Sequence, residues 1–144
     1  MVLLAGCSGT DVLNTVNGAG GYRAESDVSY GEHSRQQLDI YRPKQNDNAC
    51  LIVFVYGGSW DSGAKEQYGF VPDYQLYPEV TYPVFVEDVA HALASKPLSE
   101  LRQKRRLIMM GHSAGAMIAG LISYDPKYLN AVGLSSDIID AYVS

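Results

Sequence analysis

The sequence predicts an α/β fold with a mostly parallel sheet, flanking helices and an N-terminal antiparallel hairpin. Two apolar runs, Cys50–Val55 and Leu107–Met110, each continue into a glycine-containing turn, as fully buried parallel strands do. Apolar residues recur at helical spacing across Pro83–Ser95 and again after the second run. Two short alternating segments within Ser26–Pro43 predict the hairpin.

Composition narrows the class of protein. The 144 residues suffice for one domain with one core, and 47% hydrophobic with 19% charged residues is typical of a globular chain. The net charge is −5, and the basic run Arg102–Arg106 sits where it would solvate a loop, so no nucleic-acid partner is expected. No apolar stretch approaches the ~18 residues of a membrane span. Two cysteines do not make a disulfide framework, and nothing indicates an oligomeric state.

The N-terminus carries a possible processing signal. Leu4-Ala-Gly-Cys7 resembles the lipobox of bacterial lipoproteins, whose cysteine becomes the lipidated first residue. A signal peptide needs a charged start and about 7–15 apolar residues, so either the start is clipped or this is an ordinary apolar N-terminus. The resemblance implies membrane anchoring through Cys7, in the bacterial cell envelope facing the periplasm. It also makes Cys7 unavailable to pair with Cys50, whereas the alternative leaves a cytoplasmic protein.

The next segment, Thr10–Ala24, has the composition of a tether. Its glycines at 18, 20 and 21 are a weak phosphate-binding signal because no strand precedes them. We therefore divide the chain into residues 1–24, signal and tether, and residues 25–144, one α/β domain. In the hairpin, Val28–Tyr30 and Gln37–Tyr41 flank the turn, where His33 is expected to be solvated.

The sequence Gly111-His-Ser-Ala-Gly115 matches G-x-S-x-G and is the centre of the functional prediction. An apolar strand precedes it and a helical pattern follows, which is the context of a nucleophile elbow. Gly111 and Gly115 leave room for so tight a turn. The following helix directs its positive end at the Ser113 hydroxyl. Ser113 is therefore the candidate nucleophile, although Gly/Ser turns also join strands to helices in inert proteins.

A second glycine turn, at Gly57 and Gly58, follows the strand Cys50–Val55. Paired glycines allow the backbone to approach a ligand and to direct its amides at it. In a serine hydrolase these amides would form an oxyanion hole together with the amide of Ala114, the residue after the nucleophile. A plain Gly-Gly turn is the alternative.

Four motifs stand together: Tyr56-Gly-Gly-Ser-Trp60, Asp73-Tyr-Gln-Leu-Tyr-Pro-Glu79, Phe85-Val-Glu-Asp88 and Gly111-His-Ser-Ala-Gly115. As a set they resemble the α/β-hydrolase superfamily, in the esterase/lipase branch related to hormone-sensitive lipase, carboxylesterases and kynurenine formamidase. The resemblance runs from about Val28 to the C-terminus. It implies hydrolysis of a small-molecule ester or amide at Ser113, without a metal or organic cofactor. Where the branch usually has His-Gly-Gly, this chain has Tyr56-Gly-Gly, which alters packing or hydrogen bonding beneath the loop.

One departure from the family is an apparent internal deletion. Family members place a helix and a parallel strand between the Gly-Gly-Ser-Trp loop and the Asp-Tyr segment. Too few residues separate Trp60 from Asp73 for a crossover of a dozen or more residues plus a strand of about five. Gly69–Pro72 is the candidate remnant of that strand. Its loss should leave unpaired the two edges that it normally joins, the hairpin and the strand Cys50–Val55.

A second departure concerns the catalytic base. The superfamily order is Ser, then Asp or Glu, then His, but no histidine follows Ser113. His112 cannot curl back onto the neighbouring hydroxyl, and His33 and His91 have no family counterpart as base. The acids that follow Ser113 lie too early to match the family's acid; they are Asp125, Asp137 and Asp140. The resemblance therefore describes an internally shortened and C-terminally truncated member.

The remaining segments complete the expectation. Lys96–Arg106 is expected to link the helix to the elbow strand, and the pattern after the elbow breaks at Pro126. Asp140–Ser144 resembles the opening of the family's next strand.

The leading hypothesis is a serine carboxylic-ester hydrolase represented by an incomplete chain. The alternatives are an arylformamidase-like amide hydrolase, or a catalytically inactive remnant that acts as a binding module.

Overall fold

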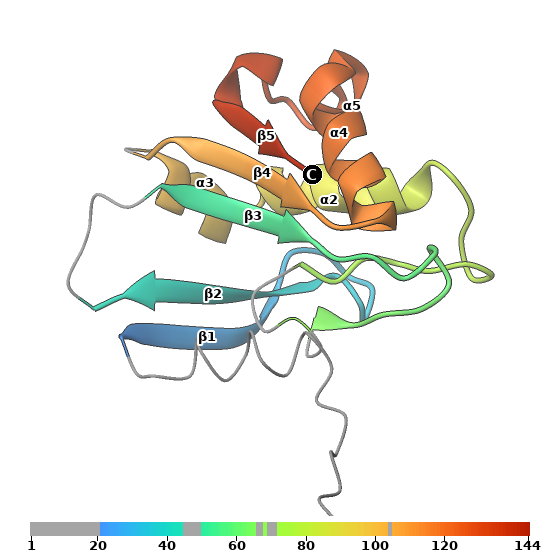
Figure 1. Cartoon of the computed structure of the whole chain (residues 1–144), viewed down its shortest axis with the longest axis horizontal. Helices are drawn as coiled ribbons and strands as arrows, with labels where there is room; N and C mark the ends of the chain where they lie inside the picture. Colours follow the sequence, from blue (N-terminus) through green and yellow to red (C-terminus); the bar gives the residue numbers. More distant parts are fainter. Residues whose placement is uncertain (1–20, 45–49, 66–67, 69–71, 104) are drawn as a thin grey trace, which may run out of the picture.

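The structure is a computed structural model that describes residues 21–44, 50–65, 68, 72–103 and 105–144 (Figure 1). Its elements, in chain order, are β1 (Tyr22–Ser29), β2 (Gln37–Pro43), β3 (Leu51–Val55), α2 (Val84–Ala94), α3 (Lys96–Arg102), β4 (Leu107–Gly111), α4 (Ala114–Tyr124), α5 (Pro126–Ala131), the short 3₁₀ helix η2 (Ser136–Ile138) and β5 (Ala141–Val143). They form two sheets: the hairpin β1–β2 and the sheet β3–β4–β5.

The predicted hairpin is confirmed. β1 and β2 pair antiparallel, with Val28 opposite Leu38 and an irregularity between Glu25 and Val28. β1 begins at Tyr22, so the expected tether is wrong in its last three residues. The rings of Tyr22 and Tyr41 meet edge-to-face, with centroids 5.1 Å apart, and such cross-strand aromatic contacts stabilise a ladder.

The second sheet is parallel, as predicted, in the order β3–β4–β5. The expectation that its apolar strands are buried on both faces is wrong for one face. Val53 and Met109 lie opposite each other and are buried, whereas Ile52 is 51% exposed. Val53 and Met109 share a core with buried residues of α2 and α4. Alternate side chains of a strand point to the other face, which here stays partly open to solvent.

The helices agree with the sequence except in one segment. α2 matches the predicted helix Pro83–Ser95 and buries Val86 and Val89 completely. The segment after it, expected to be a plain link, contains α3. Leu98 and Leu101, three residues apart on one helical face, are both buried, and a proline in the first turn is compatible with a helix. The break at Pro126 is the start of α5.

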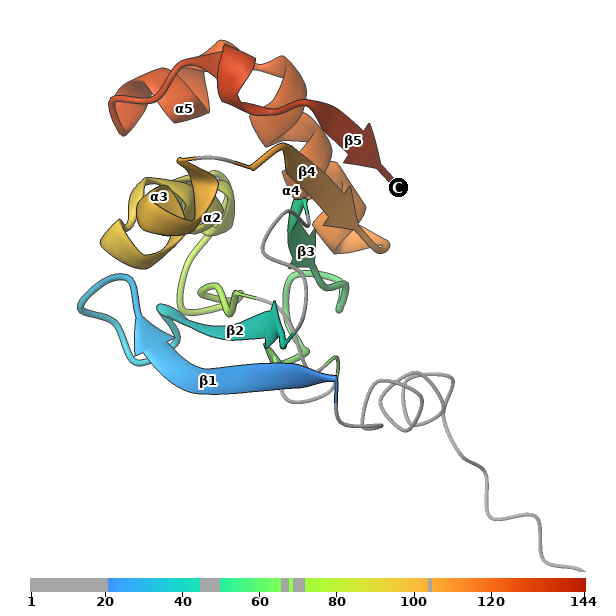
Figure 2. The same cartoon turned by 90° about the vertical axis from the view of Figure 1, so that its left-hand side faces the viewer.

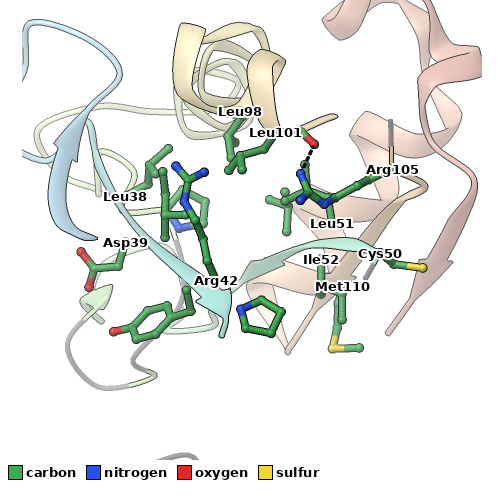
Figure 3. Close-up of a pocket in the computed structure, with 15 residues that line it drawn as sticks. Leu38, Asp39, Arg42, Cys50, Leu51, Ile52, Leu98, Leu101, Arg105 and Met110 are labelled. Atoms are coloured by element: carbon green, nitrogen blue, oxygen red, sulfur yellow. Dashed lines mark hydrogen bonds between the residues drawn. The ribbon is translucent and has the colours of Figure 1, made fainter. Parts of the chain in front are cut away.

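The hairpin and the parallel sheet are not joined by a strand ladder among the described residues, and Figure 2 shows them as separate units. Of the predicted strand remnant Gly69–Pro72, the structure describes Pro72, which forms one antiparallel bridge with Leu38. A cavity of about 370 Å³ lies between β2 and β3. Figure 3 shows Leu98 and Leu101 of α3 at this cavity, with Leu38 of β2 and Leu51 of β3. Apart from the bridge at Pro72, the edges of β2 and β3 at this cavity have no strand partner among the described residues.

Candidate active site

The two glycine turns lie side by side because they follow neighbouring parallel strands. Val55 and Gly111 are the last pair of the β3–β4 ladder, and His112 donates its amide hydrogen to the Val55 carbonyl, at 3.1 Å. Ser113 follows with φ 54° and ψ −121°, and α4 begins at Ala114. A positive φ at a serine is uncommon, and a strained strand-to-helix turn is the geometry expected of a nucleophile elbow. The Ser113 residue is exposed at the surface.

The elbow glycines are required by packing, as predicted. A Cβ built on Gly111 would lie 2.5 Å from the Gly115 carbonyl oxygen. One built on Gly115 would lie 2.1 Å from the Val55 carbonyl oxygen and 2.3 Å from that of Tyr56. These obstacles are backbone atoms, so no rotamer change relieves them. The first turn of α4 therefore presses directly on the end of β3.

Gly57 brings the second turn against Ser113. A Cβ at Gly57 would lie 2.8 Å from the His112 carbonyl oxygen and 2.9 Å from Ser113 Cβ. The backbone at Gly57 is therefore in van der Waals contact with the serine. This is the juxtaposition that an oxyanion hole requires.

Beyond Gly57 the chain folds back on itself in a tight loop. Gly58 has φ 145°, and its carbonyl accepts hydrogen bonds from the amides of Asp61 and Ser62, at 3.1 and 3.0 Å. A Cβ built on Gly63 would lie 2.8 Å from the Gly57 carbonyl oxygen. The Gly58 N–H lies on the opposite side of that planar peptide unit, so it is directed away from Gly63.

Tyr56, at the base of this loop, is fully buried and hydrogen-bonded. Its hydroxyl donates to Asp73 Oδ1 at 2.8 Å and accepts from Arg35 Nη2 at 2.9 Å. Burial, and then the Asp73 carboxylate, raise the pKa of Tyr56 above its ordinary value, so the hydroxyl stays protonated and can donate. The hydrogen bonding expected beneath the loop from the Tyr-for-His difference is present.

Sequence reasoning missed two members of this cluster. From the sequence, Asp73 was noted only as part of the family motif, with no role assigned to its side chain. It is 8% exposed and also accepts the Lys65 amide at 2.9 Å. Arg35 carried no signal, because it lies in the hairpin turn, 21 residues before Tyr56. Only the fold brings it to the loop.

Among the described residues, none of the three histidines is hydrogen-bonded to the Ser113 hydroxyl. His33 lies in the hairpin turn, where its Nδ1 accepts the Arg35 amide at 3.2 Å. His91 is an exposed residue of α2. The ring of His112 lies 6.4 Å from that of Tyr68, centroid to centroid.

Two of the three acids after Ser113, Asp125 and Asp140, have structural partners. Asp125 caps α5 by accepting the Lys127 amide, and its hydrogen bond to Lys127 lowers the pKa of the carboxyl. Asp140 Oδ2 accepts the Leu107 amide at 2.8 Å, at the end of β4 opposite Ser113. Among the residues described, no group of three or more His, Cys, Asp or Glu is placed to hold a metal.

Comparison with known proteins gives the family. A family model described as BD-FAE matches residues 38–132, which include both glycine turns and α4. The chain belongs to the BD-FAE family. It is thus an α/β-hydrolase of the esterase branch, and the resemblance noted in the sequence is confirmed.

Named relatives agree with this membership of the BD-FAE family. The chain is 30% identical to a kynurenine formamidase of Salmo salar over 109 residues, 66% of this chain and 37% of that protein. It is 30% identical to the esterase LipC of Mycobacterium tuberculosis over 139 residues, 81% of this chain and 34% of that protein. An esterase of Pyrobaculum calidifontis has the same fold, with a TM-score of 0.65 at 20% identity over 92% of this chain and 48% of that one. The chain thus spans about a third of the length of these curated relatives.

Two expectations fall outside the described residues: the lipobox with Cys7, and residues 10–20 of the predicted tether. Cys7 and the lipobox lie before residue 21, outside the described residues, so lipidation remains a prediction. Within the described part of the chain, every helix is too short or too polar to cross a bilayer.

Proposed function

We propose that this chain is the nucleophile-bearing part of a serine hydrolase that cleaves carboxylic esters of small molecules. Ser113 is the nucleophile, and the amides of Gly57, Gly58 and Ala114 bind the oxyanion. The observation that carries the proposal is the contact between the Gly57 backbone and Ser113 Cβ, across the ends of two adjacent parallel strands. Membership of the BD-FAE family supports the same chemistry.

In the proposed reaction, Ser113 Oγ attacks the ester carbonyl carbon and its proton passes to a base. The carbonyl oxygen becomes negative and is stabilised by backbone donors that are already in place. Each such donor lowers the barrier by about 2.7–4 kcal/mol. The N-terminus of α4, an 11-residue helix, adds the favourable end of its dipole. The alcohol leaves, and water then hydrolyses the acyl-enzyme by the same path.

The base is the part of this mechanism that the described residues do not supply. An unassisted serine hydroxyl is a weak nucleophile. Because Ser113 is exposed, a small base from solution can reach it. We therefore expect the 144-residue chain by itself to react slowly with acyl or phosphonyl reagents, and added imidazole to accelerate the reaction.

Amide hydrolysis is the second candidate, because the same nucleophile and oxyanion hole cleave amides as well as esters. The observation in its favour is the 30% identity to a kynurenine formamidase. The third candidate, a binding module without turnover, keeps the oxyanion hole but not an activated serine.

A fluorophosphonate probe tests the proposal. The chain and its Ser113→Ala variant are incubated with the probe at increasing imidazole concentrations, and the modified residue is mapped by peptide mass spectrometry. Modification at Ser113 that rises with imidazole supports the proposal. No modification at any imidazole concentration, or equal modification of the Ala variant, contradicts it and favours the binding module. Parallel assays with an aryl ester and an aryl formamide then separate the first two candidates.

We also propose that Cys7 is lipidated and anchors the protein in a bacterial envelope, on the strength of the lipobox-like sequence. Expression in a bacterium fed an alkyne fatty acid would label the protein, and the Cys7→Ser variant would not be labelled. Equal labelling of both, or of neither, contradicts this proposal.

A further inference from the structure

Arg35 holds both ends of the loop that carries the proposed oxyanion hole. We propose that Arg35 is a positioning residue for this loop, acting through the Tyr56 hydroxyl and the Gly63 carbonyl. The inference rests on the proposed function. It adds a residue that lies outside every motif of the sequence and that belongs to the hairpin rather than to the catalytic sheet.

The hydrogen bonds of Arg35 define the contact. Its Nη2 donates to the Tyr56 hydroxyl at 2.9 Å and to the Gly63 carbonyl at 2.8 Å. Its Nε donates to the Tyr74 carbonyl at 2.8 Å. The Tyr74 hydroxyl in turn donates to the Tyr56 carbonyl at 3.0 Å. Residue 56 directly precedes Gly57, and Gly63 closes the loop, so a single guanidinium fixes where the loop leaves β3 and where it returns.

The loop needs such support because its backbone is strained. Ser59 and Trp60 have φ of 52° and 64°, in the left-handed region that side chains disfavour, and Gly63 has φ 100°. A non-glycine residue in this region persists only where its surroundings hold it. Within the loop, the Gly58 carbonyl accepts from the Asp61 and Ser62 amides. Arg35 supplies an anchor from outside the loop.

The charge on Arg35 suits this role. Burial of the guanidinium opposes its charge, but Tyr56 and Asp73 outweigh burial, and the pKa of Arg35 is raised. Asp73 Oδ1 lies 3.5 Å from Arg35 Nη2. The planar fork holds its Nη2 and Nε donors in a fixed relative geometry, which the compact ammonium of a lysine does not reproduce. Arg35→Lys should therefore retain a cation while losing part of the anchor.

The test compares Arg35→Lys and Arg35→Ala with a control arginine of the same hairpin. Arg42→Lys is that control: Arg42 is 46% exposed, pairs with Glu25 and lies outside the loop. Two quantities are measured for each variant. The first is the imidazole-supported modification of Ser113 by the fluorophosphonate, resolved into the rate constant at saturation and the probe concentration for half-saturation. The second is amide hydrogen exchange of Asp61 and Ser62, whose N–H groups donate to the Gly58 carbonyl within the loop, followed by NMR.

In Arg35→Ala we expect the saturated rate constant to fall by about a hundredfold, the typical effect of a misplacement of about 1 Å. The probe concentration for half-saturation should change little, and exchange of the Asp61 and Ser62 amides should accelerate. Guanidinium ion at low concentration should restore part of the rate. Arg35→Lys should lie between Ala and the unchanged chain, and Arg42→Lys should match the unchanged chain. The circular dichroism spectrum and thermal midpoint of each variant identify any that fail to fold.

The results separate this inference from the proposed function. If the unchanged chain never reacts at Ser113, the proposed function fails. If it reacts and Arg35→Ala reacts equally fast, with the Asp61 and Ser62 amides equally protected, the positioning role fails. A loss of rate in Arg35→Ala that follows its loss of thermal stability, without faster local exchange, also overturns the positioning role.

Discussion

Gly115→Ala tests whether the elbow is packed as tightly as the structure shows. The added methyl carbon would lie 2.1 Å from the Val55 carbonyl oxygen, more than an ångström short of ordinary van der Waals contact. The obstructing atom belongs to the backbone of β3, which is hydrogen-bonded to β4. The methyl can be accommodated only if α4 and β3 move apart.

The magnitude follows from two opposing contributions. Alanine in place of glycine favours a helix by about 1 kcal/mol, whereas overpacking of this kind costs about 1–3 kcal/mol or more. With rigid backbone on the receiving side, the upper end of the cost applies. We expect a net loss of about 2 kcal/mol in the free energy of unfolding, a large share of the ~5–15 kcal/mol of a typical domain.

A matched control lies on the same helix. A Cβ at Gly120 would lie 3.2 Å from the Tyr142 hydroxyl oxygen, the far end of a side chain. Gly120→Ala should therefore stay within about 1 kcal/mol of the unchanged chain, because the helix preference offsets a small adjustment. Urea denaturation followed by circular dichroism measures both variants. If Gly115→Ala proves as stable as Gly120→Ala, the contact between α4 and β3 is not the one described.

Three further predictions follow from other contacts. Gly57→Ala places a methyl 2.9 Å from Ser113 Cβ and should slow imidazole-supported modification of Ser113 at least tenfold. This is less than the roughly hundredfold or greater loss when a whole oxyanion donor is removed. Modification at an unchanged rate would refute the proposed oxyanion hole. Asp88, 2% exposed, accepts from the Gln75 amide at 2.8 Å, so Asp88→Ala leaves buried donors unpaired and should cost about 1–3 kcal/mol by urea denaturation. The hydrogen bond from Lys127 lowers the pKa of Asp125, so its stabilisation is present above the ordinary pKa of 3.8 and lost as pH falls through the lowered value. The small, salt-sensitive difference in urea midpoint between the unchanged chain and Asp125→Asn should therefore be present at pH 7 and vanish in acid; a difference that persists in acid contradicts this assignment.

The parts of the fold that sequence predicted are those fixed by local pattern. The run Leu107–Met110 can only be a buried strand or a short buried helix, and the glycine turn after it decides between them. Gly111 and Gly115 are needed because backbone atoms occupy the space of their side chains. These glycines are close to Ser113 in the sequence, so the strand-turn-helix segment could be predicted from the sequence alone.

What sequence missed depends on distant contacts. Nothing near Arg35 indicates that its guanidinium reaches Tyr56, because the partners meet only after the hairpin packs on the loop. The exposure of Ile52 depends on which face of the sheet the helices cover, and the apolar run alone cannot tell. The short helix α3 was missed because its two buried leucines are too few to establish a period.

The strand deletion predicted from the sequence does not prevent the two glycine turns from meeting, because contacts other than strand pairing connect the hairpin to the parallel sheet. Where the family has a strand, the described residues leave a cavity between β2 and β3. Leu38 and Ile40 of β2 still share the hydrophobic core with the parallel sheet and its helices. Polar contacts also join the two units: Lys65, on the chain leading from β3, pairs with Asp39 of β2 at 3.0 Å, and Arg35 bonds to Tyr56 and Gly63. Both polar contacts involve the segment that follows the end of β3. The turn that carries Ser113 follows the neighbouring end of β4. A chain in which one edge of β3 is unpaired can thus still hold Ser113 close to the Gly57 backbone, with the contacts of Lys65 and Arg35 supporting the loop between them.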